Sequence, residues 1–389
     1  MVKNLFNVCS SLKLTVVLLV LGCVLVFWGT LAQVHLGLYK AQNEFFRSFF
    51  ITWQPANGGF KIPIFPGGYF IGTALLINLL AAHLRFYQPG KRKIGIMFIH
   101  LGVMLLLVGQ MLTDALSRES ALHLRIGETK NYSEAQRAYE LAVADVTDPK
   151  SENVVAIPAS LLTPDKGLDV SGLYRQGQLT FGLVAKSFYA NSELSEKPAD
   201  GFTQVQAEAG FGNGFYWREL SHETAMDRSD TPSAIVEVTG SRGTPGPGTF
   251  LVSGYLNQPQ QFTFDGRNYE ISLRPARYYM PFSVNLLEFH HDDYPGTDIP
   301  RNFSSRVRVQ NPQNHEDRQV LIYMNNPLRY AGLTFYQASY DPDDGGSILQ
   351  VVHNPGWLTP YFSCLLVGAG LIIQFGQHLV PFLKRRLAA

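Results

Sequence analysis

Four apolar segments, each long enough to cross a lipid bilayer as a helix, constrain this chain more than any other feature. The hydrocarbon core of a bilayer is about 30 Å thick, which a helix spans with roughly 20 residues. The segments are residues 14–32, 69–85, 94–112 and 357–380. We therefore expect an α+β membrane protein with four transmembrane helices.

The remaining sequence divides around these segments. Residues 1–112 form an N-terminal membrane region with three spans and an outer loop at 33–68. Residues 113–356 contain no comparable apolar run and are long enough to fold as a separate domain. Residues 357–389 form the fourth span and a short basic tail. This order places the large domain between helices three and four.

Basic residues flank the spans unevenly, which predicts the orientation. The three basic clusters are Lys3 and Lys13, then Arg85, Lys91, Arg92 and Lys93, then Lys384, Arg385 and Arg386. With four spans all three clusters fall on one side, which is the cytoplasm. Both termini are then cytoplasmic, and the domain at 113–356 is extracytoplasmic. The alternative for the first span is a cleaved signal peptide, with Thr30 and Ala32 as the small residues before the cleavage site.

Charge and cysteine content exclude several functions. The formal net charge is +1, so bulk charge gives no indication of nucleic-acid binding. Cys9, Cys23 and Cys364 all lie inside or beside the spans, which leaves the large domain without a thiol. The chain has no CxxC pair, which argues against a thiol-disulfide carrier, and no CxxCH haem-attachment motif, so it is not itself a c-type cytochrome.

The domain between spans three and four is predicted to be β-rich. Apolar and polar residues alternate in six segments separated by Gly, Pro, Asn and Asp. These are residues 179–190, 232–240, 268–275, 304–310, 318–324 and 332–340. The expected architecture is a sandwich or an open barrel of antiparallel strands.

The third span contains an ionisable residue, His100. Gly95, Gly102 and Gly109 recur every seven residues and share one helix face, where they permit close approach by a neighbouring helix. Each residue advances about 100° around the axis, so His100 lies roughly 140° to 180° from that glycine face. An unpaired polar group in hydrocarbon costs several kcal/mol, about 4 to 8 on transfer scales, so His100 needs another partner. Another helix, a partner subunit and a metal are the candidates.

Two further histidines are expected at a similar depth. His83 lies near the end of span two and His378 near the end of span four, both close to basic residues. Their proximity to the headgroup region favours a plain interfacial role over ligation. A neutral imidazole is a good axial ligand for haem iron, but haem, zinc and a proton relay remain open for His100 on sequence alone.

Three other features invite functional readings. Tyr330, Tyr336 and Tyr340 are expected to share one face and could dock an apocytochrome or a partner, although packing into the core is the more common role for such a face. The sequence HHDD at 290–293 is interpreted as a solvated loop, because adjacent histidines in a strand point to opposite faces. Phe45, Phe46, Phe49, Phe50 and Trp53 have spacings that suit an amphipathic interfacial helix.

Several sequences resemble the ResB family, also called CcsB, of system II cytochrome c biogenesis. They are HHDDYPGTDIPRNFSSRVRV at 290–309, NNPLRYAGLTFYQASY at 325–340, HNPG at 353–356 and HLG at 100–102. The four-span plan also resembles that family. Where the family often has Asp-Pro-Gly before the last span, this chain has Asn354, Pro355 and Gly356.

The resemblance implies a function, a cofactor and partners. Family members act in the bacterial plasma membrane with a CcsA or ResC type protein that carries a tryptophan-rich motif, and together they bring haem b outward and attach it to the CxxCH thiols of apocytochrome c. An intramembrane histidine of the family ligates haem jointly with one from the partner, and His100 is the matching position. This chain lacks a tryptophan cluster, since Trp28, Trp53, Trp217 and Trp357 are scattered, so attachment is expected on the partner.

Two other hypotheses remain open at this stage. The chain could be an assembly factor that binds no haem and whose β-rich domain holds apocytochrome or partner. It could also be a transporter that uses His100 as a proton relay, but the spans show no inverted repeat and few other polar groups.

Overall fold

The computed structural model describes residues 2–55, 60–86, 93–149, 151–164, 179–212, 214–226, 228–240, 246–297 and 300–387. Lys91 and Arg92 of the second basic cluster lie outside the described residues. The chain divides into two compact units: residues 1–118, 224–226 and 353–389 form the first, and residues 119–223 and 227–352 form the second.

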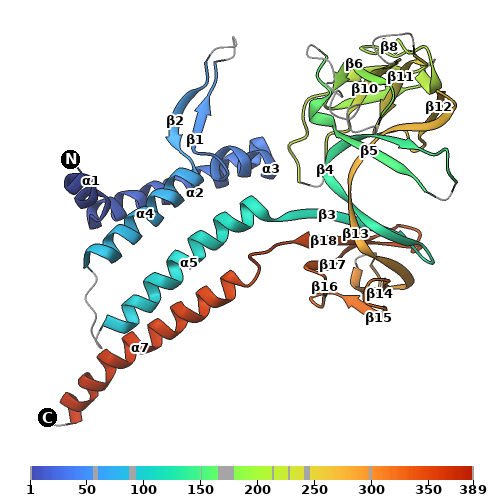
Figure 1. The fold of residues 1–389 in the computed structure, drawn as a ribbon. Coiled ribbons are helices and arrows are strands. Elements are labelled where there is room, and N and C mark those ends of the chain that lie inside the picture. Colours follow the sequence, from blue (N-terminus) through green and yellow to red (C-terminus); the bar gives the residue numbers. More distant parts are fainter. Residues whose placement is uncertain are drawn as a thin grey trace. The chain divides into compact units, whose positions relative to one another are not determined.

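The first unit is helical (Figure 1). Its elements are α1 (Val2–Cys9), α2 (Leu12–Leu36), α3 (Leu38–Ala41), a π-helix (Gln42–Phe46), β1 (Phe50–Trp53), β2 (Ile62–Pro66), α4 (Gly68–Phe86), α5 (Ile94–Leu116) and α7 (Thr359–Leu387). Among the described residues, α2, α4, α5 and α7 are long and apolar enough to cross a membrane, which confirms the four predicted spans.

The helix bounds differ from the predicted ones mainly at the ends. α5 continues four residues beyond 112, so Thr113 and Asp114 belong to the helix. α7 begins at Thr359, because Asn354 Oδ1 accepts a hydrogen bond from the Gly356 backbone (2.9 Å) and forms the preceding turn. It then continues through Pro381 to Leu387.

The aromatic loop between α2 and α4 does not form the predicted amphipathic helix. Phe45 and Phe46 belong to the π-helix, and β1 pairs with β2 as an antiparallel hairpin. Phe45 and Ile51 are buried against Leu25 and Ile71, which form a small core of the helical unit. Aromatic spacing suits either a helix or a hairpin here, and packing against α2 and α4 selects the hairpin.

The second unit is β-rich, as predicted, and most of its strands belong to a large antiparallel sheet (Figure 1). Its strands are β3 (Arg118–Arg125), β4 (Thr129–Asp145), β5 (Asn153–Pro158), β6 (Gly182–Tyr189), β7 (Ser192–Ser195), β8 (Thr203–Gln204), β9 (Tyr216–Glu219), β10 (Ser233–Thr239), β11 (Gly248–Ser253), β12 (Gln260–Phe264), β13 (Arg267–Asp293), β14 (Pro300–Asn311), β15 (Glu316–Tyr323), β16 (Leu328–Tyr330), β17 (Leu333–Tyr340) and β18 (Gly346–His353). Short 3-10 helices span Ala159–Leu161 and Gly210–Gly212.

The large sheet curls into a nearly closed barrel. Its strand order is β15-β14-β13-β4-β3-β18-β17-β16, and β12 and β5 pair with β13 and β4 outside this path. β15 at one end contacts β16 and β17 at the other, and a single bridge joins Tyr323 to Asn326. The predicted open barrel is therefore the better description of this part.

Two hydrophobic cores share one strand, β13. Tyr269, Ile271 and Leu273 of β13 belong to a core shared with the three-stranded sheet β11-β10-β6. Phe282 and Val284 of the same strand belong to the core inside the barrel. Inward positions change from odd to even numbers along the part of β13 where its pairing with β4 is irregular, between Pro275 and Arg277 and again between Tyr279 and Val284.

Candidate functional site

The histidines predicted in spans two and three lie side by side. The ring centroids of His83 on α4 and His100 on α5 are 6.3 Å apart, and the ring planes are inclined by 69°. His83 lies in the last turn of α4 and His100 in the second turn of α5, and the two helices pack against each other. Both side chains are half-buried. The sequence predicted a similar depth for both residues, and the structure adds their contact.

The glycine face of α5 packs against α7, which confirms the predicted close approach. Gly95, Gly102 and Gly109 are all buried. A Cβ added at Gly95 would lie 2.8 Å from the Gly370 carbonyl oxygen, and one added at Gly102 would lie 2.6 Å from Val367 Cγ2. His100 faces α4 instead, so the helix packed against the glycine face does not provide a contact for the His100 side chain.

His378 has a different neighbour. It lies on α7, where the Gln374 amide donates to His378 Nε2 at 2.8 Å, one helical turn away. Gln374 itself borders Gly95 on the glycine face of α5. The structure thus brings His83 and His100 together, whereas the Nε2 atom of His378 accepts a hydrogen bond from a residue of its own helix.

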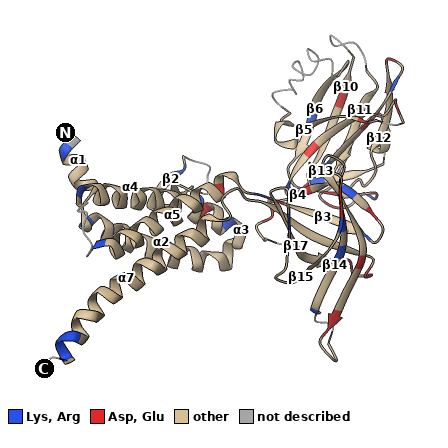
Figure 2. Cartoon of the chain, turned by 60° about the horizontal axis from the view of Figure 1, so that its bottom comes forward, with Lys and Arg blue, Asp and Glu red and all other residues tan. Residues whose placement is uncertain are grey.

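The histidine pair lies at the basic end of the helical unit. Arg85 is in the last turn of α4, Lys93 precedes α5, and Lys384 is in the last turn of α7. Figure 2 shows Lys and Arg at the helix ends near both chain termini. Arg85 also donates to Ser10 Oγ at 2.8 Å, which ties α4 to the turn between α1 and α2.

The donor set at the pair limits the metal chemistry it can support. Within the described residues, no group of three or more His, Cys, Asp or Glu side chains could hold a metal ion. A protein zinc site needs three or four such ligands. Two imidazoles instead fit a metal whose other coordination positions are filled by its own macrocycle, as in haem, where the protein supplies only axial ligands.

Sequence reasoning missed a polar cluster at the opposite end of the bundle. Arg47 Nε lies 3.0 Å from Asp114 Oδ1, and the Tyr69 hydroxyl donates to Asp114 Oδ2. Asp114 was assigned to the large domain because the predicted span ended at 112. An aspartate within two residues of the end of an apolar run was the signal that could have found it.

The three tyrosines predicted to share a face are divided between the two faces. Tyr330 is in β16, packs edge-on against the core residue Phe282 at 4.8 Å and donates to Glu316 at 2.7 Å. Tyr336 is 37% exposed on the other face of the sheet. Tyr340 stacks on His291 at 4.9 Å. The shared face is therefore wrong for Tyr330, because the turn between β16 and β17 pairs Tyr330 with the inward-facing Leu333.

The HHDD sequence ends strand β13 and is not the predicted solvated loop. His290 and His291 point to opposite faces, as expected of adjacent strand residues. His290 is exposed near Glu288 at 3.7 Å, whereas His291 is largely buried and lies 3.0 Å from Asp344. Pairing of β13 with β14 as far as Asp293 explains the extra strand length.

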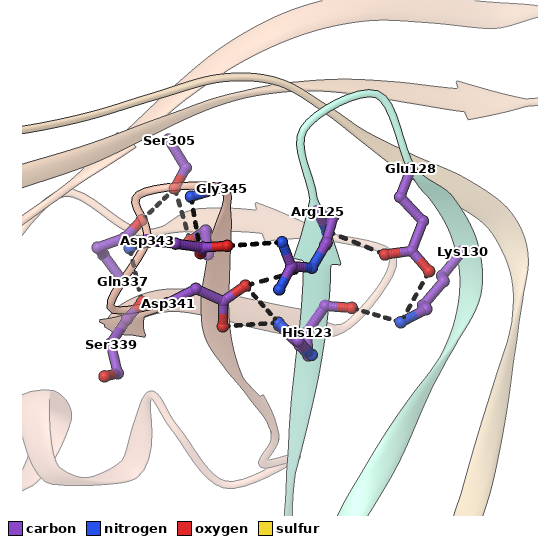
Figure 3. A network of polar contacts seen from close by, with 11 residues as sticks. His123, Arg125, Glu128, Lys130, Ser305, Gln337, Ser339, Asp341, Asp343 and Gly345 are labelled. Atoms are coloured by element: carbon purple, nitrogen blue, oxygen red, sulfur yellow. Dashed lines mark hydrogen bonds and ion pairs between the residues drawn. The ribbon is translucent and has the colours of Figure 1, made fainter. Parts of the chain in front are cut away.

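A polar network holds the turn after β17 against β3 (Figure 3). His123 Nε2 lies 2.9 Å from both carboxylate oxygens of Asp341. Arg125 Nη1 donates to Asp343 at 2.9 Å, and this hydrogen bond lowers the pKa of the Asp343 carboxyl below its ordinary value. His291 of β13 contacts Asp344 in the same turn. Three carboxylates of this turn are therefore bound by side chains of β3 and β13. The network stabilises the barrel at this turn.

Together the apolar helices, the paired histidines and the barrel define a membrane protein with a large folded β-rich unit. A sequence profile of the ResB-like family matches residues 90–348, which is more than half of the chain. The chain belongs to the ResB-like family.

Two named proteins are similar in sequence to this chain. NrfI from Wolinella succinogenes is 25% identical over 302 residues, which cover 77% of this chain and 29% of NrfI. The cytochrome c biogenesis protein CcsB from Picosynechococcus sp. is 38% identical over 80 residues, which cover 21% of this chain and 17% of that protein. The matches thus span less than a third of the length of either relative.

Proposed function

We propose that this chain is an accessory subunit of cytochrome c maturation that binds haem within the membrane through His100. It would act with a CcsA or ResC type partner to bring haem to the outer face, where the partner attaches it to apocytochrome c. The observation that carries the proposal is the His83–His100 pair in the helix bundle of a ResB-like protein. The name of the CcsB relative supports the process.

The orientation follows from the basic residues. Arg85, Lys93 and Lys384 lie at helix ends on the histidine side, and basic residues favour the cytoplasm. We place both termini on the cytoplasmic side of a bacterial plasma membrane and the β-rich unit outside. His100 is six residues, or about 9 Å, from the start of α5, so it lies in the inner half of the bilayer and receives its ligand from that side.

His100 would act as a neutral axial ligand. When bound, haem would supply an iron atom that accepts imidazole nitrogens as ligands. The apolar surfaces of α4 and α5 would shield the bound group from water, and the neutral form of the His100 imidazole is the form that would ligate it. The resemblance to the family implies that the partner supplies the second ligand.

The structure also favours a second candidate for that ligand, His83. Metal–imidazole bonds are about 2 Å long, so two imidazoles that would hold one metal ion have ring centroids up to roughly 6 Å apart. The centroid separation of 6.3 Å for His83 and His100 has this size. Ligation within one chain would then load haem before the partner binds.

Absorption spectra of the purified protein test the proposal. The chain coexpressed with its partner is expected to copurify with haem that has a low-spin bis-histidine spectrum. His100→Ala should abolish the signal, whereas His378→Ala, which removes a histidine already hydrogen-bonded to Gln374, should keep it. A complex of normal yield that stays colourless with ample haem supply contradicts haem binding and favours the assembly-factor hypothesis.

The chain purified without its partner identifies the second ligand. If His83 supplies it, the chain alone shows the bis-histidine spectrum, and His83→Ala converts the spectrum to a five-coordinate one. If the partner supplies it, the chain alone does not show this spectrum, and His83→Ala leaves the complex spectrally unchanged.

A further inference from the structure

A cavity lies in the helical unit, at the end opposite the histidine pair. Its volume is about 610 Å³, within the range of small-molecule sites. The last turns of α5 and the first turns of α4 form two of its walls, and the end of α2, α3 and the π-helix form the rest. Gln110 and Asp114 follow His100 by ten and fourteen residues, or roughly 15 and 21 Å along α5, so this cavity is separate from the proposed haem site.

One side of the cavity is polar but carries no net charge. Arg47 and Asp114 are the one cation and the one anion among its described lining residues, and they form an ion pair at 3.0 Å. The Tyr69 hydroxyl also donates to Asp114. Gln33, Gln42 and Gln110 line the same cavity and present amide groups. This wall therefore suits a neutral group that forms hydrogen bonds better than it suits an anion.

The other side of the cavity is apolar, and part of it is backbone without a side chain. Leu38, Phe46, Leu76, Leu107 and Met111 line it. Gly72 adds a patch of exposed backbone, because a Cβ placed on Gly72 would meet nothing within 4 Å. An apolar body can therefore lie against α4 here without displacing a side chain.

We propose that this cavity binds a small amphipathic molecule with an apolar body and a neutral head that carries carbonyl or hydroxyl oxygens. Membrane quinones and diacylglycerols both have this chemistry. The glutamine amides and the free N–H groups of Arg47 donate to the oxygens of the head, while Asp114 keeps Arg47 from attracting an anion. An anionic amphiphile such as haem or an acidic phospholipid would have to break the Arg47–Asp114 pair.

Ligand binding to the full-length chain in nanodiscs tests the cavity. The probes are decylubiquinone and dioctanoylglycerol, measured by isothermal titration calorimetry. We expect one of them to bind, and which one identifies the source of the ligand. Gly72→Leu fills the cavity and should weaken that binding by roughly tenfold or more. Gly368→Leu on α7 is the matched control, because a Cβ there also meets nothing within 4 Å, and it should bind as the wild type does.

A charge change tests the neutral head separately. Asp114→Asn leaves the positive charge of Arg47 without its counter-ion. The variant should therefore bind dioctanoyl phosphatidic acid at least about tenfold more tightly than the wild type does. Three outcomes would each overturn the proposal. The wild type binds neither neutral probe, Gly72→Leu binds the probe as tightly as the wild type, or the wild type binds phosphatidic acid as tightly as Asp114→Asn does. None of these measurements uses haem or cytochrome c, so their outcome is independent of the proposed function.

Discussion

Asn78 is a buried polar residue in the middle of an apolar helix. It is 1% exposed, and its amide nitrogen donates to the carbonyls of Cys9 (2.7 Å) and Ser11 (3.1 Å), while its oxygen accepts from Thr15 (2.6 Å). These bonds satisfy backbone carbonyls at the break between α1 and α2. Asn78 therefore fixes the start of α2 against α4.

Replacing Asn78 should destabilise the helical unit. Asn78→Ala leaves the carbonyls of Cys9 and Ser11 without these donors, which costs about 1–3 kcal/mol. The measurement is thermal unfolding in detergent. Thr30→Ala is the control, because the exposed Thr30 hydroxyl donates to a carbonyl of its own helix, that of Val26 at 2.7 Å, and this change should cost far less. Equal stability of both variants would contradict the role of Asn78.

Asp317 should contribute stability that depends on pH. Its bidentate hydrogen bond with Arg308 (2.6 and 2.5 Å) lowers the pKa of the Asp317 carboxyl below its ordinary value. A carboxyl with a lower pKa in the folded state stabilises the fold above its unfolded pKa, near 4, and loses that contribution as the pH falls through the folded pKa.

Asp317→Asn should therefore lower the melting temperature at about pH 6, and the difference from the wild type should shrink as the pH falls below about 4. Melting curves of the full chain across this range measure the difference. The exposed Asp200 supplies the control substitution, Asp200→Asn, whose difference from the wild type should stay small at every pH. A difference for Asp317→Asn that does not shrink as the pH falls is the contrary result.

Elements meet through small residues in the helical unit. Gly95 on α5 and Gly370 on α7 approach so closely that a Cβ added to either would lie within 2.8 Å of the other's carbonyl oxygen. Close backbone contact of this kind is a common way for helices to associate in lipid. The α5–α7 contact should therefore depend on side-chain volume along this face.

Gly102→Leu should separate α5 from α7. The new side chain would meet Val367 and the Ser363 carbonyl, and overpacking of this kind costs about 1–3 kcal/mol. Thermal unfolding in detergent measures the loss. Gly376→Leu on the open side of α7 is the control, since a Cβ there meets nothing within 4 Å. If both variants lose the same stability, the glycine face is not a packing contact.

Hydropathy and periodicity predicted the elements that depend on local pattern. The four spans and the glycine face of α5 followed from apolar length and a seven-residue spacing. The contact between His83 and His100 did not, because the rotation of α4 about its axis depends on packing with α2 and α5. Asp114 was missed because hydropathy alone ended the helix at Leu112, whereas backbone hydrogen bonds continue it to Leu116.

Strand pairing was the least predictable part of the fold. β13 pairs with β4, which precedes it by more than a hundred residues, and no local pattern encodes such a partner. The polar residues of β4 also obscured its alternation, so its 17 residues were not predicted as a strand. Tyr330 was assigned to the wrong face for a related reason, since the β16–β17 turn sets its register.

Membrane orientation is a prediction for the whole molecule. In a chain whose Cys9, Cys23 and Cys364 are replaced by Ser, Gln313→Cys should react with an impermeant maleimide in intact cells, because it lies in an exposed turn of the β-rich unit. Arg385→Cys should react only after the membrane is permeabilised. The reverse pattern would invert the proposed topology and place the β-rich unit in the cytoplasm.

Strand β13 also has a mechanical consequence. Its 27 residues would measure at most about 90 Å if fully extended, and they pass from one core of the β-rich unit into the other without a flexible linker. Tension applied to either end of the strand must load both cores together. Under a pulling force, the two halves of this unit should rupture as one event.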